Sequence, residues 1–65
     1  MTYREAYRKA KSQEELIKMI RHDLLTWRLY GRNPDRLRNI ERAMNEVVEE
    51  KKWDITTIQE GVDRV

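Results

Sequence analysis

The chain has 65 residues, which is enough for one small domain (1–65), and a net charge of +2. It contains no cysteine, which excludes disulfides and thiolate metal sites. No apolar run approaches the ~20 residues of a membrane span, so we expect a cytoplasmic protein with no membrane partner. Charged residues make up 40% of the chain while glycine and proline are rare, which predicts an all-α fold.

A short first helix is predicted over residues 3–11. Thr2 is followed three residues later by Glu5, which is the spacing of a capping box at a helix start. A helix of this length is marginal by itself, so it needs a neighbour to pack on. The side chains expected to face that neighbour lie on one stripe: Tyr3, Ala6, Tyr7 and Ala10.

The second predicted helix covers residues 13–30 and starts from another capping box, Ser12 with Glu15. Its apolar arc is wide and predicts contact with two neighbouring elements. Leu25 and Leu29 lie almost opposite that arc, four residues apart on one face. Either a terminal helix covers these two leucines, or they form a self-association surface that would make the protein a homodimer.

The sequence from 31 to 34, Gly-Arg-Asn-Pro, predicts a helix end followed directly by a helix start. Gly31 suits the left-handed conformation that ends a helix, Asn33 is a favourable N-cap and Pro34 fits the first helical position. The next helix is predicted over 34–51. Two helices of nearly equal length joined by so short a turn form an antiparallel hairpin.

A fourth helix is predicted over about 55–64, starting after either Asp54 or Thr56. Trp53 precedes it and has two interpretations: it packs on Ile58 as a hydrophobic staple, or it is an exposed aromatic anchor for a partner. The whole chain is thus expected to form a small bundle of three to four helices.

Basic residues concentrate in the first two thirds of the chain. Residues 1–42 hold eleven lysines and arginines against six acids, whereas residues 43–65 hold three against six. Around the turn, an arginine set is a candidate contact for an anionic partner. The alternative is a solvated surface neutralised locally by Asp35, Glu41 and Glu46. The members of the arginine set are Arg28, Arg32, Arg36, Arg38 and Arg42.

Catalytic constellations are missing from the sequence. His22 is the only histidine, its helical neighbours are not carboxylates, and Ser12 is the only serine. We therefore expect no enzyme activity, no cofactor, no metal and no small-molecule substrate. The leading hypothesis is a small helical protein–protein interaction module, accessory or regulatory, possible as a homodimer. The second hypothesis is nucleic-acid binding through the basic helix-turn at 28–42.

Overall fold

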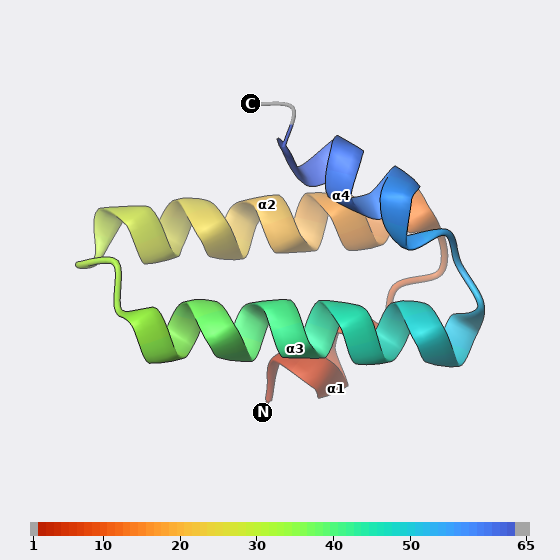
Figure 1. Ribbon diagram of the computed structural model, residues 1–65, viewed down its shortest axis with the longest axis horizontal. Coiled ribbons are helices and arrows are strands. Elements are labelled where there is room, and N and C mark those ends of the chain that lie inside the picture. The colour runs from red at the N-terminus through yellow and green to blue at the C-terminus, as the bar shows by residue number, and fades with distance from the viewer. Residues whose placement is uncertain (1, 64–65) are drawn as a thin grey trace.

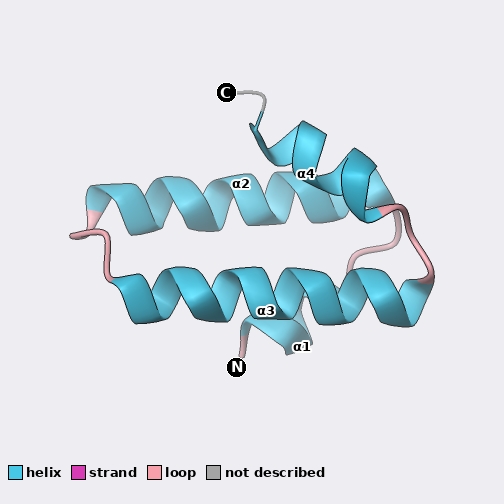
Figure 2. Ribbon diagram, viewed as in Figure 1, coloured by secondary structure: helices cyan, strands magenta, loops and turns pink. Residues whose placement is uncertain are grey.

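The computed structural model describes residues 2–63 and contains four helices over that range. They are α1 (Tyr3–Arg8), α2 (Gln13–Leu29), α3 (Pro34–Lys51) and α4 (Ile55–Asp63). Helices α2 and α3 run antiparallel as the predicted hairpin, with α1 beside α3 and α4 over α2 (Figures 1 and 2). The predicted all-α bundle is confirmed.

Each helix begins at a predicted N-cap, where a side chain accepts hydrogen bonds from backbone N–H groups that have no partner within the helix. The Thr2 hydroxyl accepts from Glu5 N–H and the Ser12 hydroxyl from Glu15 N–H, both at 3.2 Å. Asp54 accepts from Thr56 N–H at 2.9 Å. The fourth helix therefore starts after Asp54, and the alternative start after Thr56 is wrong.

The first helix is shorter than predicted, because it ends at Arg8 and not at residue 11. Lys9 N–H bonds to the Ala6 carbonyl and Ala10 N–H to the Tyr7 carbonyl, so the final turn tightens to three-residue spacing. The Ala10 carbonyl then accepts from Lys51 Nζ at 2.6 Å. Lys51 on α3 thus takes the place of the backbone N–H that would donate to the Ala10 carbonyl in a longer helix.

The corner between α2 and α3 has the predicted chemistry. Gly31 has φ 105°, Arg32 follows at φ 53°, and Arg32 N–H reaches back to the Trp27 carbonyl at 3.0 Å. This six-to-one bond is the helix-ending pattern that a left-handed glycine allows. The predicted helix over 13–30 therefore stops one residue early, with Tyr30 in a non-helical backbone conformation.

The corner between α3 and α4 uses the same pattern without glycine. Lys52 adopts the left-handed conformation at φ 56°, and Trp53 N–H bonds to the Val48 carbonyl at 3.0 Å. A lysine carries a Cβ that crowds the backbone in this conformation, so the position costs conformational energy. The last predicted residue of α4, Arg64, lies outside the described residues.

The core contains side chains from all four helices. Tyr7, Leu16 and Ile58 are each 0% exposed, and Gly61 lets α4 approach α2 closely, because a Cβ there would lie 2.5 Å from Ile17 Cδ1. The predicted stripes of α1, α3 and α4 supply most of the rest. The buried set is Tyr7, Ala10, Leu16, Ile20, Ile40, Ala43, Met44, Val47, Val48, Ile58 and Val62.

Polar contacts fasten the short α1 to the hairpin. Tyr7 Oη donates to Asp23 Oδ2 on α2 at 2.6 Å, and Arg8 pairs with Glu50 on α3 at 2.7 and 3.0 Å. Burial and the Asp23 carboxylate raise the pKa of the Tyr7 phenol, which stays protonated. Arg8 holds the pKa of the exposed Glu50 below its usual range. α1 is thus attached to both long helices.

Candidate functional site

The second half of α2 carries the large apolar side chains that the described fold leaves exposed. Leu25 is 53% exposed, Leu29 is 71% exposed and Tyr30, at the end of the helix, is 76% exposed. Leu25 and Leu29 are one helical turn apart and so form a continuous apolar strip. We call Leu25, Leu29 and Tyr30 the α2 strip. The alternative that a terminal helix covers the two leucines is wrong, because both remain more than half exposed with α1 and α4 in place.

The α2 strip lies in a basic environment. Arg21 and Arg28 are four and three residues from Leu25, and Lys18 and His22 are also on the exposed part of the helix. Between residues 16 and 34 the sequence contains a single acid, Asp23. That carboxylate accepts a hydrogen bond from the Tyr7 hydroxyl on the α1 side of the helix. The strip is therefore bordered along α2 by cations.

Beside the α2 strip, a groove of about 470 Å³ lies between α2 and the end of α4. Leu24, Leu25 and Val62 supply its apolar surface, and Val62 is 8% exposed. The other lining residues are charged or titratable: Lys18, Arg21, His22, Arg28 and Asp63. An apolar floor with a mostly basic wall is suited to a ligand that is both apolar and anionic.

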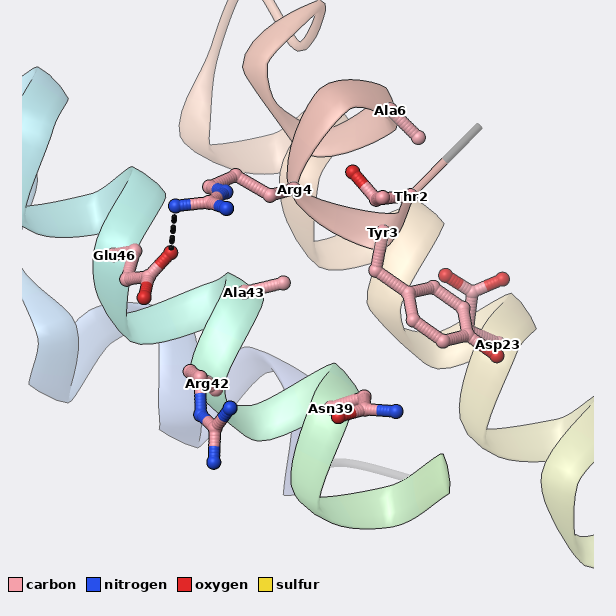
Figure 3. A pocket seen from close by; sticks show the side chains of 9 residues that line it. All are labelled: Thr2, Tyr3, Arg4, Ala6, Asp23, Asn39, Arg42, Ala43 and Glu46. Carbon is pink, nitrogen blue, oxygen red and sulfur yellow. Dashed lines mark ion pairs between the residues drawn. The ribbon is translucent and has the colours of Figure 1, made fainter. Parts of the chain in front are cut away.

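A second and wider cavity of about 710 Å³ lies between α1 and the hairpin (Figure 3). Its lining contains Asp23, Asn39, Arg42 and the ion pair of Arg4 with Glu46 at 2.9 Å. The charged groups of this cavity are of both signs, and Figure 3 shows two of them paired across α1 and α3. Asp23 is already engaged by Tyr7. The contacts that attach α1 to the hairpin therefore account for the charged groups that line this cavity.

The structure does not gather the predicted arginine set into one patch. Arg28 lines the groove beside α4, whereas Arg42 lines the cavity beside α1. Arg38 forms an ion pair with Asp35 one turn earlier on α3. Arg32 and Arg36 remain exposed at the corner. The five arginines thus divide between two sides of the hairpin and its corner.

Lys18, Arg21 and His22 were missing from the sequence prediction, although they border the predicted leucines. Their positions on the helix place them on the same exposed face as Leu25 and Leu29, so helical periodicity alone was sufficient to find them. The prediction concentrated on arginines near the turn. The structure places Lys18, Arg21 and His22 beside Leu25, together with Arg28 from the predicted set.

Trp53 is half-buried and packs against the core at the corner between α3 and α4. The Lys51 ammonium lies 4.9 Å from the centre of its ring and also donates to the Ala10 carbonyl. A cation at this distance from an indole is attracted by the ring face. These contacts join the second corner to the end of α1 and account for Trp53 as a packing residue.

The described residues contain no group of three or more histidine, cysteine, aspartate or glutamate side chains placed to hold a metal ion. Within residues 2–63, no helix has both the length and the apolarity to cross a membrane. Comparison of the chain with family models, curated proteins and solved structures finds no match. The described residues thus form a small bundle of four helices, in which α2 carries an exposed face with both apolar and basic side chains.

Proposed function

We propose that this protein is a small, non-enzymatic interaction module, accessory or regulatory in role, which binds a partner protein through the α2 strip. The single observation that carries the proposal is the exposure of Leu25 and Leu29, at 53% and 71%, on consecutive turns of a helix. Contiguous exposed apolar surface with a polar border is typical of protein-binding sites. The adjacent Tyr30 adds an amphipathic aromatic group of the kind enriched at interfaces.

The charge around the strip favours a different protein over a second copy. In a symmetric homodimer the same patch faces itself, so the cations beside Leu25 would oppose those of the other copy. Like charges placed together across an interface are unfavourable. A partner with acidic groups avoids this repulsion. Homodimer formation through the strip is therefore the second candidate function, and the experiments below test it together with binding of a different protein.

The proposal is tested by affinity capture from cells of the native host followed by quantitative mass spectrometry. The wild type is compared with the double variant Leu25→Asp, Leu29→Asp. A matched control, Asn39→Asp with Thr56→Asp, adds the same charge at exposed positions outside the strip. We expect the strip variant to lose partner proteins that the wild type and the control both retain.

Two results would contradict the proposal. One is an unchanged set of captured proteins for the strip variant; the other is equal loss in the strip variant and the control. Circular dichroism of all three proteins checks that each remains helical, because the substituted positions are exposed and not part of the core. Sedimentation equilibrium across concentrations tests the second candidate. If the strip mediates self-association, the wild type dimerises and the strip variant does not.

A further inference from the structure

We propose that the groove between α2 and the end of α4 binds an acidic amphipathic helix of the partner protein. This inference rests on the interaction function proposed above and specifies the chemistry of the partner. The groove has an apolar part, formed by Leu24, Leu25 and Val62, and cationic side chains from α2 beside it. A helix that presents apolar residues between glutamates or aspartates complements both features.

The spacing of the cations along α2 fits a helical ligand. Lys18 and Arg28 are ten residues apart in α2, which corresponds to about 15 Å along the helix axis and about three turns of a partner helix. Arg21 lies between them, one turn beyond Lys18. Carboxylates on successive turns of the ligand would meet these cations while its apolar stripe covers Leu25. An arginine side chain can hold a carboxylate through two parallel hydrogen bonds.

Few local acids compete for these cations. Asp63 is the one carboxylate that lines the groove among the described residues. The ion pairs described over residues 2–63 involve Arg4, Arg8 and Arg38, and none involves the groove cations. The charge of Lys18, Arg21 and Arg28 is therefore available to a ligand. Complementary charge of this kind mainly gives orientation and a faster encounter.

Two other occupants fit the groove less well. A second copy docked symmetrically would place the cations of one groove against those of the other, which is unfavourable. A nucleic acid would use the cations but leave the exposed α2 strip without an apolar counterpart. In addition, Arg42 lines a different cavity. An apolar and acidic peptide uses both kinds of group.

The test is a fluorescence anisotropy titration with a labelled peptide of about 14 residues, or about four helical turns, with leucines at helical spacing and glutamates beside them. The comparison probes are a scrambled peptide of the same composition, the same peptide with lysine for glutamate, and a duplex oligonucleotide. We expect saturable binding of the acidic amphipathic peptide, at least about tenfold tighter than the scrambled one and weakened by salt. The lysine peptide is not expected to bind.

Charge reversal supplies the decisive comparison. The variant Arg21→Glu, Arg28→Glu should lose the glutamate peptide and acquire binding of the lysine peptide, whereas the control Lys9→Glu, Arg36→Glu should behave as the wild type. All four positions are exposed, so helicity measured by circular dichroism should persist. An exchange of peptide preference cannot result from unfolding, because an unfolded variant would bind neither peptide specifically.

Several outcomes would overturn the inference. They are equal binding of the scrambled peptide, tighter binding of the oligonucleotide, or no binding of any peptide. A further such outcome is self-association of the wild-type protein that lowers the fraction of bound peptide as the protein concentration rises. The two proposals fail separately. If Leu25→Asp, Leu29→Asp abolishes partner capture but Arg21→Glu, Arg28→Glu does not, the interaction function stands and the acidic-helix inference is wrong. If the strip variant captures the same proteins as the wild type, the proposed function itself fails.

Discussion

The two halves of the hairpin differ in how much they bury. Residues 2–20 and 40–63, the closed half, contain every buried side chain of the described structure, whereas residues 21–39, the open half, contain none. The short helices α1 and α4 lie mainly against the closed half (Figure 1). They reach only the border of the open half, where Tyr7 bonds to Asp23 and Val62 lies beside Leu24 and Leu25. Two helices side by side cannot surround a core, so Leu25, Leu29 and Tyr30 of the open half stay at the surface.

Directional bonds order the corner of the open half, where Leu24 and Trp27 are only partly buried against the core. Trp27 Nε1–H donates to the Asn33 carbonyl at 2.7 Å, and Asn33 Oδ1 accepts from Asp35 N–H at 2.8 Å. The Arg32 N–H bond to the Trp27 carbonyl adds a third contact within the same corner. Leu25, Leu29 and Tyr30 take no part in these bonds. The corner can therefore be ordered while the α2 strip remains free to meet a partner.

The largest predicted effect is the difference in stability loss between two leucine substitutions on α2, one in each half of the hairpin. Leu16 is 0% exposed and Leu29 is 71% exposed, both on α2. Leu16→Ala should lower the free energy of unfolding by about 2–5 kcal/mol, because it removes buried methyl groups and leaves a cavity. Leu29→Ala should change it by less than about 0.5 kcal/mol. Urea unfolding followed by circular dichroism measures both.

The contrast between the halves would be wrong if the two leucine variants lost similar stability. A large loss for Leu29→Ala would mean that the strip is covered in solution, for example by a second copy. Repeating the measurement at several protein concentrations distinguishes that case, because the stability of a dimer depends on its concentration. Concentration-independent values with the expected difference support an exposed strip on a monomer.

The second prediction concerns the attachment of α1 to α2 of the hairpin. Tyr7→Phe removes the hydroxyl that donates to Asp23 Oδ2 at 2.6 Å and leaves the ring in place. A hydrogen bond to a charged group contributes about 1.5–3 kcal/mol, so we expect a loss of that order. Thermal unfolding at neutral pH measures it. An unchanged melting temperature would show that the bond does not contribute to holding α1.

Tyr7 also predicts a dependence on alkaline pH. Burial and Asp23 raise the pKa of the Tyr7 phenol, so above the ordinary tyrosine value of about 10 the unfolded chain loses a proton that the folded chain keeps. The wild type should then lose about 1.4 kcal/mol of stability per pH unit more than Tyr7→Phe does. The difference in the free energy of unfolding between the wild type and Tyr7→Phe should therefore narrow above pH about 10.

Local chemistry made the helices predictable from sequence. Thr2, Ser12 and Asn33 each cap the helix that was expected to follow them, and the hairpin corner formed where Gly31 and Pro34 predicted it. The early end of α1 was not predictable, because the Ala10 carbonyl is satisfied by Lys51, which is distant in the sequence. The division of the arginine set was equally hidden, since it depends on which side of the hairpin α1 and α4 cover.

The smallest predicted effects compare the two corners, one in each half. Gly31, at φ 105°, has no heavy atom within 4 Å of an added Cβ, so Gly31→Ala adds backbone strain without a clash. We expect it to cost about 1–2 kcal/mol. Lys52 already carries that kind of strain at φ 56°, so Lys52→Gly should relieve it and stabilise the fold by about 0.5–1 kcal/mol, after the added freedom of the unfolded chain is counted.

Chemical denaturation of both variants checks the opposite signs. The matched control is Lys51→Gly, one residue earlier and at the last position of α3, where glycine should destabilise because it weakens the helix. It also removes the ammonium that contacts Trp53 and the Ala10 carbonyl. If Lys52→Gly destabilised the protein as Lys51→Gly does, the second corner would not hold Lys52 in a strained left-handed conformation, and the two corners would end their helices by different means.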